Sequence, residues 1–191
     1  NGIKKSFKLS KGKIIFFLDS DDFFLKKKID LIVKLFKKNK KLNFIQDTPY
    51  SSKQKLKLKL KEKDHNVSIW PSFFPTSSIA VRRNFFEGFL KLSKSNEFPN
   101  LEIDARLCIY AFLKKEYTYT KKSLTIYNYD QFGITSKYKK FGINWWQKRY
   151  EAYSYMIFLM KKMNIKFNPS FDYYFTKLIN FFIYSNKNSS I

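Results

Sequence analysis

The sequence is poor in the residues that build disulfide-stapled or zinc-clustered folds. It has one cysteine, Cys108, and one histidine, His65, in 191 residues. A single cysteine excludes an internal disulfide framework, and a single histidine excludes zinc sites made of several His and Cys ligands. Any metal bound by these residues must therefore take oxygen ligands. No run of about 18 apolar residues is present, which excludes a membrane-spanning helix within this sequence.

Acidic residues are also few. The chain has 15 acidic and 38 basic residues and a formal charge of +23, which attracts nucleic acids and anionic membranes. However, 34 of the basic residues are lysine and only 4 are arginine, the side chain that binds phosphate through two parallel hydrogen bonds. We interpret most of the charge as a compositional bias carried on solvated surfaces, which does not favour a nucleic-acid partner.

Apolar and aromatic residues are abundant, at 44% and 20% of the chain. This content is too high for a disordered basic tail and is enough to bury a sizeable core. Periodicity predicts α-helices over 29–36, 84–92, 143–163 and 171–184, and strands over 14–18, 42–46, 76–83 and 118–129. For 53–63, both an edge strand and a mobile loop fit the alternation of Lys and Leu. These elements predict an α/β fold over 1–136 and a C-terminal appendix of amphipathic helices over 137–191.

The most informative feature is an acidic cluster that follows a predicted strand. The apolar run Ile14–Leu18 is typical of a strand buried on both faces of a helix-covered sheet, and it is followed by Asp19, Asp21 and Asp22. Open α/β sheets bind ligands at the carboxyl ends of their strands. The cluster therefore suits a divalent cation shared with substrate phosphates, although helix capping and turn formation explain the same residues equally well.

Several segments carry a resemblance to a known family. They are Asn1-Gly2-Ile3, the run from Lys11-Gly12 through the strand to Asp22, the segment Pro75–Phe86, and Tyr127-Asn128-Tyr129. Together they resemble the family-two nucleotide-sugar glycosyltransferases with the GT-A fold, over about residues 1–136. The resemblance implies a partial GT-A domain, a Rossmann-like mixed sheet with flanking helices. It also implies that the first βαβ unit of such a domain precedes Asn1.

The resemblance further implies roles for the acidic cluster. Asp22 is the expected ligand of Mg²⁺ or Mn²⁺, with Asp21 beside it as a second ligand. Asp21 is also expected to lie toward the ribose or the diphosphate of the donor. Asp19 is expected to support the turn and to contribute to substrate binding. The metal would neutralise the departing nucleoside diphosphate.

An inverting transfer needs a carboxylate that takes the proton of the acceptor hydroxyl. At the place where the family has adjacent Glu and Asp residues, this sequence has Glu102-Ile103-Asp104, and we favour Asp104 over Glu102 as the base. Two acids that complement a helix N-terminus explain these residues almost as well. Arg82 is a candidate for binding the diphosphate or a lipid-linked acceptor.

The resulting prediction is a metal-assisted, inverting glycosyltransferase that uses a nucleotide-sugar donor and a saccharide, lipid-linked or protein acceptor. We expect a cytoplasmic location, with peripheral contact at the inner face of the cell membrane through the C-terminal helices or packing of those helices on the core. The alternatives are a basic, aromatic-rich nucleic-acid-binding module and a catalytically inactive surface or assembly module.

Overall fold

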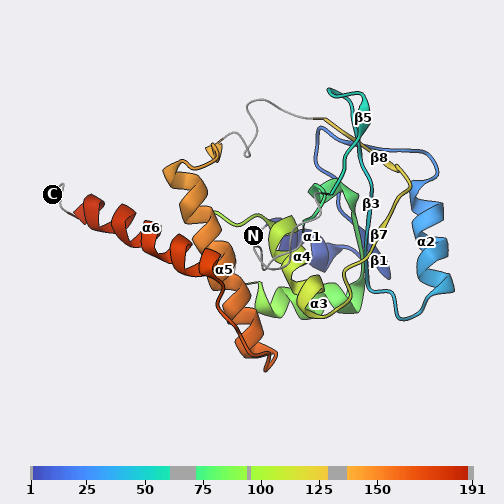
Figure 1. Cartoon of the computed structure of the whole chain (residues 1–191). Coiled ribbons are helices and arrows are strands. Elements are labelled where there is room, and N and C mark those ends of the chain that lie inside the picture. The colour runs from blue at the N-terminus through green and yellow to red at the C-terminus, as the bar shows by residue number, and fades with distance from the viewer. Residues whose placement is uncertain (1, 61–71, 94–95, 129–136, 189–191) are drawn as a thin grey trace. The chain divides into compact units, whose positions relative to one another are not determined.

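The structure is a computed structural model that describes residues 2–60, 72–93, 96–128 and 137–188. The chain forms two compact units (Figure 1). The first contains the described strands and comprises Asn1–Leu60, Phe73–Lys94 and Lys114–Tyr129. The second is helical in its described part and comprises Lys61–Ser72, Ser95–Leu113 and Asp130–Ile191. These units differ from the predicted domains chiefly because Ser95–Leu113 groups with the C-terminal helices, and the domain limits themselves stay a prediction.

The larger sheet of the first unit is mixed. Its strand order is β1 (Ile14–Phe16), β6 (Ile79–Arg82), β3 (Phe44–Asp47) and β7 (Tyr119–Thr120). β6 is antiparallel to both β1 and β3, and β3 is parallel to β7. β1, β3 and β7 therefore run in one direction, and the segments that follow them leave the same end of the sheet.

β1 departs from expectation in its burial. The continuous apolar run predicted a strand covered on both faces, but all three residues of β1 are only half-buried. The reason is that β1 lies at an edge of the sheet within the described residues and pairs with β6 alone.

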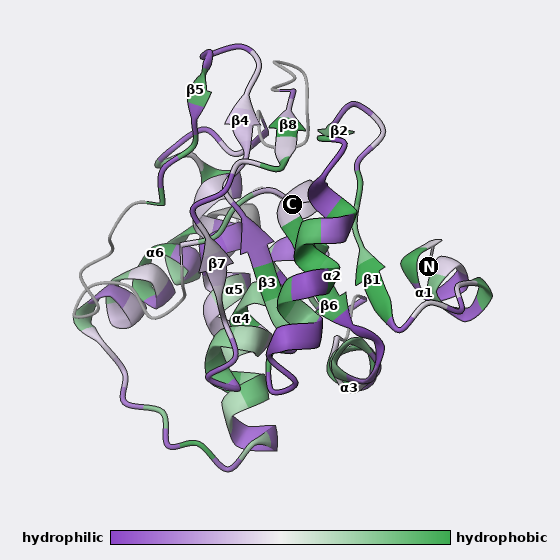
Figure 2. Ribbon diagram, turned by 90° about the vertical axis from the view of Figure 1, so that its right-hand side faces the viewer, coloured by the Kyte–Doolittle hydropathy of each residue, from purple (hydrophilic) through white to green (hydrophobic). Residues whose placement is uncertain are grey.

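The two faces of this sheet are covered by different elements. Ile45 and Ala80 pack with Ile32 and Phe36 of α2 (Lys28–Lys38) in one core cluster. Phe44, the neighbour of Ile45 in β3, points the other way and contacts Phe85 of α3 (Arg83–Leu92), with 6.4 Å between ring centroids. In Figure 2, α2 alternates between hydrophilic and hydrophobic colours, as expected for a helix with one face on a sheet.

The smaller sheet of the first unit borders the acidic cluster. Its order is β2 (Phe23–Phe24), β8 (Thr125–Tyr127), β4 (Tyr50–Ser51) and β5 (Leu56–Lys57). β2 follows Asp22 directly and pairs antiparallel with β8, with Phe23 opposite Ile126. The segment that was expected to be an edge strand or a loop thus supplies β5 at the edge of this sheet, while residues 61–71, including His65, lie outside the described residues.

One ion pair lies in the interior of the first unit. Lys28 Nζ is 2.7 Å from Asp47 Oδ1, and both side chains are 0% exposed. The same ammonium group donates to the Ser77 carbonyl and to Thr125 Oγ1, each at 2.6 Å. Asp47 accepts hydrogen bonds from Leu124 N–H at 3.1 Å and from the Thr125 hydroxyl at 3.0 Å. Because a buried charge is tolerated only when it is paired and hydrogen-bonded, this network fixes α2, β3, β8 and the 3₁₀ turn η1 (Thr76–Ser78) against one another.

The second unit consists of α4 (Ile103–Leu113), α5 (Ile143–Lys162) and α6 (Phe171–Asn188). α4 is almost entirely buried, and its residues from Ala105 to Ala111 are all inaccessible to solvent or nearly so. Phe98, which precedes α4, packs edge-on against Tyr155 of α5 with 5.3 Å between ring centroids. The predicted helices over 84–92, 143–163 and 171–184 are confirmed as α3, α5 and α6.

We expect Lys28→Met to lower the free energy of unfolding by about 3–5 kcal/mol, because Asp47 would remain as an unpaired buried charge. The double variant Lys28→Met/Asp47→Asn removes both charges and keeps an oxygen acceptor for Leu124 N–H, so it should be more stable than the single variant. Urea unfolding of the three proteins measures both differences. A single variant as stable as the parent protein would show that the pair does not hold the core.

Candidate functional site

The acidic turn, Asp19–Asp22, leaves the carboxyl end of β1. Asp22 N–H donates to the Asp19 carbonyl at 3.2 Å, which closes the turn. Asp19 N–H donates to Ser77 Oγ at 2.8 Å, and the Ser77 carbonyl in turn accepts from Lys28. The turn is therefore attached through one residue to the buried network beneath it.

Asp22 is the member of the acidic turn whose side chain is buried, with 4% exposure. Its Oδ1 accepts a hydrogen bond from Asn128 N–H at 2.8 Å. Its Oδ2 is also buried, and among the described residues it has no hydrogen-bond partner. A buried carboxylate oxygen without a donor costs free energy, so this atom is a position where a cation or a donor group would bind favourably.

Asn128 fixes both the backbone and the side chains of the acidic turn. Besides its N–H bond to Asp22, its Nδ2 donates to the Asp21 carbonyl at 2.5 Å, and its Oδ1 accepts from the Ser52 hydroxyl. The sequence pattern marks Asn128 only as part of a strand. Its role depends on a contact across 106 positions of the chain, and no local pattern marks such a contact.

The electrostatics of the acidic turn leave negative charge uncompensated. Burial raises the pKa of Asp22 above its ordinary value, and the Asp21 charge adds to this, whereas the Ser77 hydroxyl, Asn128 N–H and Lys28 oppose it. Loss of hydration likewise raises the pKa of Asp19, and the charges of Asp22 and Asp21 raise it further. A divalent cation would relieve both effects.

The residues of the acidic turn fit a divalent metal that keeps part of its shell for phosphate and water. Asp22 supplies the orphaned Oδ2, and Asp21 is exposed beside it. Within the described part of the chain, no three His, Cys, Asp or Glu side chains are grouped so that they would hold a metal together. Such a site suits Mg²⁺ or Mn²⁺, because Mg²⁺ takes one or two protein carboxylates when substrate phosphates complete the coordination.

Arg82, the candidate for binding the diphosphate or a lipid-linked acceptor, does not lie at the acidic turn, and its role in binding stays a prediction. Arg82 pairs with Ile14, at the opposite end of β1 from Asp19. Its guanidinium donates to the carbonyls of Phe36 and Leu42, both at 2.7 Å, and thereby caps the end of α2. The Arg82 side chain lies at the end of α2 because β6 runs antiparallel to β1. The sequence pattern does not indicate this strand direction.

Glu102 and Asp104 lie at the start of α4 in the second unit, and the acidic turn lies in the first. Glu102 Oε1 accepts from Lys148 Nζ at 2.5 Å, so its charge is paired. Asp104 lies in the first turn of α4, where its Oδ1 accepts from Ala105 N–H at 2.7 Å. Which of the two carboxylates is the base stays a prediction.

Cys108 is fully buried in the middle of α4, as expected for a small apolar residue. Burial raises the pKa of its thiol well above the ordinary value, and the Asp104 charge adds to this. A thiol with a raised pKa is a poor nucleophile, so Cys108 is not a candidate catalytic residue.

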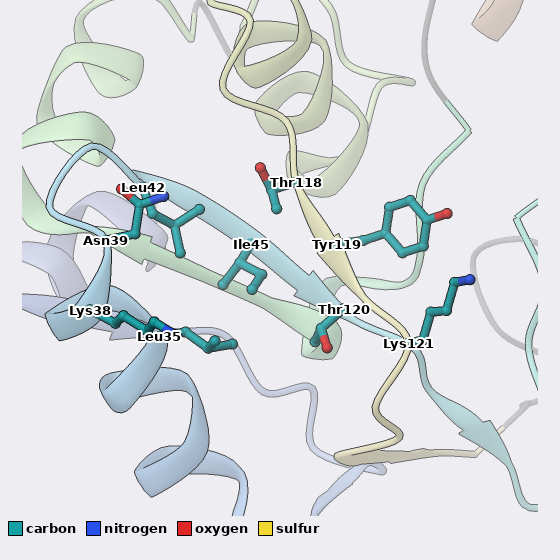
Figure 3. A pocket seen from close by; sticks show the side chains of 9 residues that line it. All are labelled: Leu35, Lys38, Asn39, Leu42, Ile45, Thr118, Tyr119, Thr120 and Lys121. Atoms are coloured by element: carbon teal, nitrogen blue, oxygen red, sulfur yellow. The ribbon is translucent and has the colours of Figure 1, made fainter.

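A hollow of about 570 Å³ lies at another place in the first unit (Figure 3). It is lined by the end of α2 and the edge strand β7, including Leu35, Lys38, Ile45, Tyr119 and Lys121. None of its lining residues belongs to the acidic turn. The hollow therefore lies beside the edge strand of the larger sheet and is separate from the acidic turn.

Comparison with known proteins agrees with this geometry. The sequence profile of the family described as Glycosyl transferase family 2 matches residues 1–94, which include the acidic turn, Lys28 and Ser77. By this match, residues 1–94 are similar to glycosyl transferase family 2. No curated protein is similar enough in sequence to count as a relative.

Among solved structures, the chain is similar to S. aureus TarS 1–349, which was crystallised in complex with UDP-GlcNAc. The TM-score is 0.51 at 9% sequence identity, over 79% of this chain and 44% of the TarS chain. The chain thus spans less than half of the length of the protein it matches, and the likeness is one of fold. It confirms the predicted fold class, a partial GT-A, Rossmann-like arrangement of mixed sheets and flanking helices followed by C-terminal helices.

The uncompensated charge of the acidic turn predicts a stability change. Because the pKa of Asp22 is raised on folding, its ionisation opposes folding as the pH rises through the folded pKa, and this cost is absent below the unfolded pKa. We expect Asp22→Asn to raise the free energy of unfolding at pH 7 by ~1 kcal/mol in metal-free buffer. The amide oxygen can still accept from Asn128 N–H.

Thermal unfolding with and without a chelator measures this change, and the gain should vanish near pH 3. Asp30→Asn, at an exposed site in the first turn of α2, is the matched control. It removes a charge that favours the helix N-terminus, so it should lower the free energy of unfolding by ~0.5 kcal/mol and not raise it. An Asp22→Asn protein less stable than the parent at pH 7 would contradict the account.

Proposed function

We propose that this chain is the catalytic segment of a metal-assisted, inverting glycosyltransferase that moves a sugar from a nucleotide-sugar donor to a saccharide, lipid-linked or protein acceptor. The observation that carries the proposal is the buried Oδ2 of Asp22, unpartnered among the described residues, at the carboxyl end of β1 inside the family 2 segment. The UDP-GlcNAc held by TarS supports a nucleotide sugar as the donor class. A cytoplasmic location, where such a donor would be met, is part of the proposal.

In this proposal, the chain's own residues prepare the donor side before the substrate arrives. Asp22 and Asp21 hold the cation, which supplies charge neutralisation at the departing diphosphate. Asn128 fixes Asp22 through its Oδ1 and leaves Oδ2 for the ligand. Ser77 holds the other end of the turn through Asp19 N–H. Because these dipoles are in place in advance, no reorganisation is needed as charge develops on the leaving group.

On the acceptor side, we assign proton removal to Asp104. The acceptor hydroxyl gives its proton to the Asp104 carboxylate while its oxygen bonds to the anomeric carbon, and the bond from that carbon to the diphosphate breaks. Glu102 is less suited to this role because Lys148 already binds its carboxylate.

The nucleic-acid alternative receives no support from the arginines. Arg82 and Arg83 donate to backbone carbonyls, Arg149 pairs with Asp172, and Arg106 is 9% exposed. None of these four arginine side chains is therefore placed as expected for a residue that binds a nucleic-acid phosphate. The alternative of an inactive assembly module is separated from the enzyme by the next experiment.

We predict that the chain binds UDP in the presence of Mn²⁺ and that Asp22→Asn weakens this binding at least about tenfold, because a carboxylate ligand becomes a neutral amide. Isothermal titration with UDP, with Mn²⁺ or with EDTA, measures the effect. Asp30→Asn should bind as the parent protein does. Equal UDP affinity in the parent and in Asp22→Asn would refute the metal site and favour the inactive module.

For the base, we predict that Asp104→Asn lowers the rate of sugar transfer by about 10²–10⁴-fold, the range typical of general-base removal. Glu102→Gln should keep the rate within about tenfold, because it loses an ion pair and not the base. Transfer from a radiolabelled nucleotide sugar to a panel of saccharide acceptors measures both. Full activity in Asp104→Asn would sink the assignment.

A further inference from the structure

α6 buries two polar side chains and exposes most of its large apolar side chains. Thr176 and Asn180 are 0% and 2% exposed, whereas Phe171 and Leu178 are 84% and 52% exposed. A surface helix of a globular protein has the reverse arrangement, with its apolar stripe on the core. The outward face of α6 therefore needs a separate explanation.

The inward orientation is fixed by specific polar contacts with α5. The Arg149 guanidinium pairs with Asp172 and also donates to Thr176 Oγ1 at 3.2 Å. Asn180 Nδ2 donates to the Trp146 carbonyl at 3.0 Å. Turning α6 over would break these contacts and leave the Arg149 charge without its carboxylate, so the outward face is a stable property of the helix pair.

We define the α6 stripe as the exposed apolar side chains at spacings of three and four along the helix. Such spacings bring side chains onto one face. Each member is at least 45% exposed, and the members are Phe171, Tyr174, Phe175, Leu178, Phe181 and Phe182. Lys177 lies exposed beside the stripe.

The apolar surface extends from the α6 stripe to the start of α5. Phe175 packs edge-on against Trp146, with 5.7 Å between ring centroids, and Trp146 contacts Phe141 at 6.3 Å. Phe141 is 64% exposed and has a φ of 66°, a left-handed conformation that bulky residues rarely adopt. The backbone of Phe141 is therefore in an unfavourable conformation, and the exposed ring of this residue enlarges the apolar surface. Lys140 Nζ lies 4.8 Å from the centre of that ring.

The C-terminal segment that carries this surface has a positive net charge. Residues 137–191 contain ten basic and two acidic side chains. Both acids are engaged within the second unit, Glu151 with Asn100 and Asp172 with Arg149. A surface of this kind complements an anionic partner that also offers an apolar interior.

We propose that the α6 stripe and Phe141 form a surface on which the protein rests on an anionic lipid bilayer, with α6 lying in the interface. Exposed Phe, Tyr and Trp side chains flanked by lysines are the composition of interfacial helices. A second copy fits less well, because two equally basic surfaces would face each other. In the part of the chain that the structure describes, none of the helices has the length and hydropathy of a membrane-spanning segment.

Co-sedimentation of the full chain with vesicles tests this proposal. We expect binding to phosphatidylcholine vesicles with about 30% phosphatidylglycerol, weaker binding without the anionic lipid, and release as salt rises toward about 1 M. Leu178→Glu/Phe182→Glu should lower the partition coefficient at least about tenfold. Leu9→Glu, which places the same charge at a 74% exposed leucine of α1 (Gly2–Leu9), should leave it unchanged.

A second readout reports insertion directly. In a Trp70→Phe background, the emission of Trp145 and Trp146 should shift to the blue on anionic vesicles and be quenched by brominated lipid. Circular dichroism confirms that each variant is folded. Equal vesicle binding by the α6 variant and the parent overturns the proposal. A parent dimer in light scattering that dissociates in the α6 variant, with no vesicle binding by either, also overturns it and assigns the stripe to self-association.

Discussion

The buried pair of Lys28 and Asp47 is the constraint on which the first unit depends. A charged ammonium group with no access to water is stable only because a carboxylate, a carbonyl and a hydroxyl accept all of its protons. These acceptors come from β3, η1 and β8, three elements far apart in the sequence. The same ammonium group lies close enough to Asp22 to oppose the rise in the pKa of that carboxyl. The network is thus both the centre of the core and the support of the acidic turn.

The first unit treats its two buried carboxylates in opposite ways. Asp47 has a cation and donors for both of its oxygens, whereas Asp22 has a donor for one oxygen and, among the residues that the structure describes, none for the other. A hydrogen-bond network in which every group has a partner stabilises a fold. A buried polar group without a partner lowers the free energy of unfolding, and a bound ligand can offset this loss. The difference in hydrogen bonding between Asp47 and Asp22 distinguishes a structural carboxylate from a candidate ligand-binding one. The sequence alone does not distinguish them.

The elements set by local pattern could be predicted from the sequence, and the long-range contacts could not. The apolar periodicity of α2, α3 and α5 and the Asp-rich end of β1 are local signals, and the structure contains each of them. The buried role of Lys28 was not predicted, because its neighbours Lys26 and Lys27 are exposed and the sequence offers no mark that distinguishes the three. The contacts of Asn128 and Arg82 were not predicted for a related reason, because their partners depend on how the strands pair and in which direction they run. The outward face of α6 was also hidden, because periodicity gives the position of an apolar stripe but not the side to which it turns.

The central claim is that the acidic turn, held by the buried pair, is the place where a cation and a nucleoside diphosphate bind. A crystal structure determined after soaking with Mn²⁺ and UDP tests this claim most directly, because the anomalous signal of manganese locates the ion without reference to any assumed site. We expect a manganese peak in contact with Asp22 Oδ2 and a diphosphate on the far side of the ion. Manganese and UDP bound elsewhere, for example in the hollow between α2 and β7, with an unchanged and empty acidic turn, would contradict it.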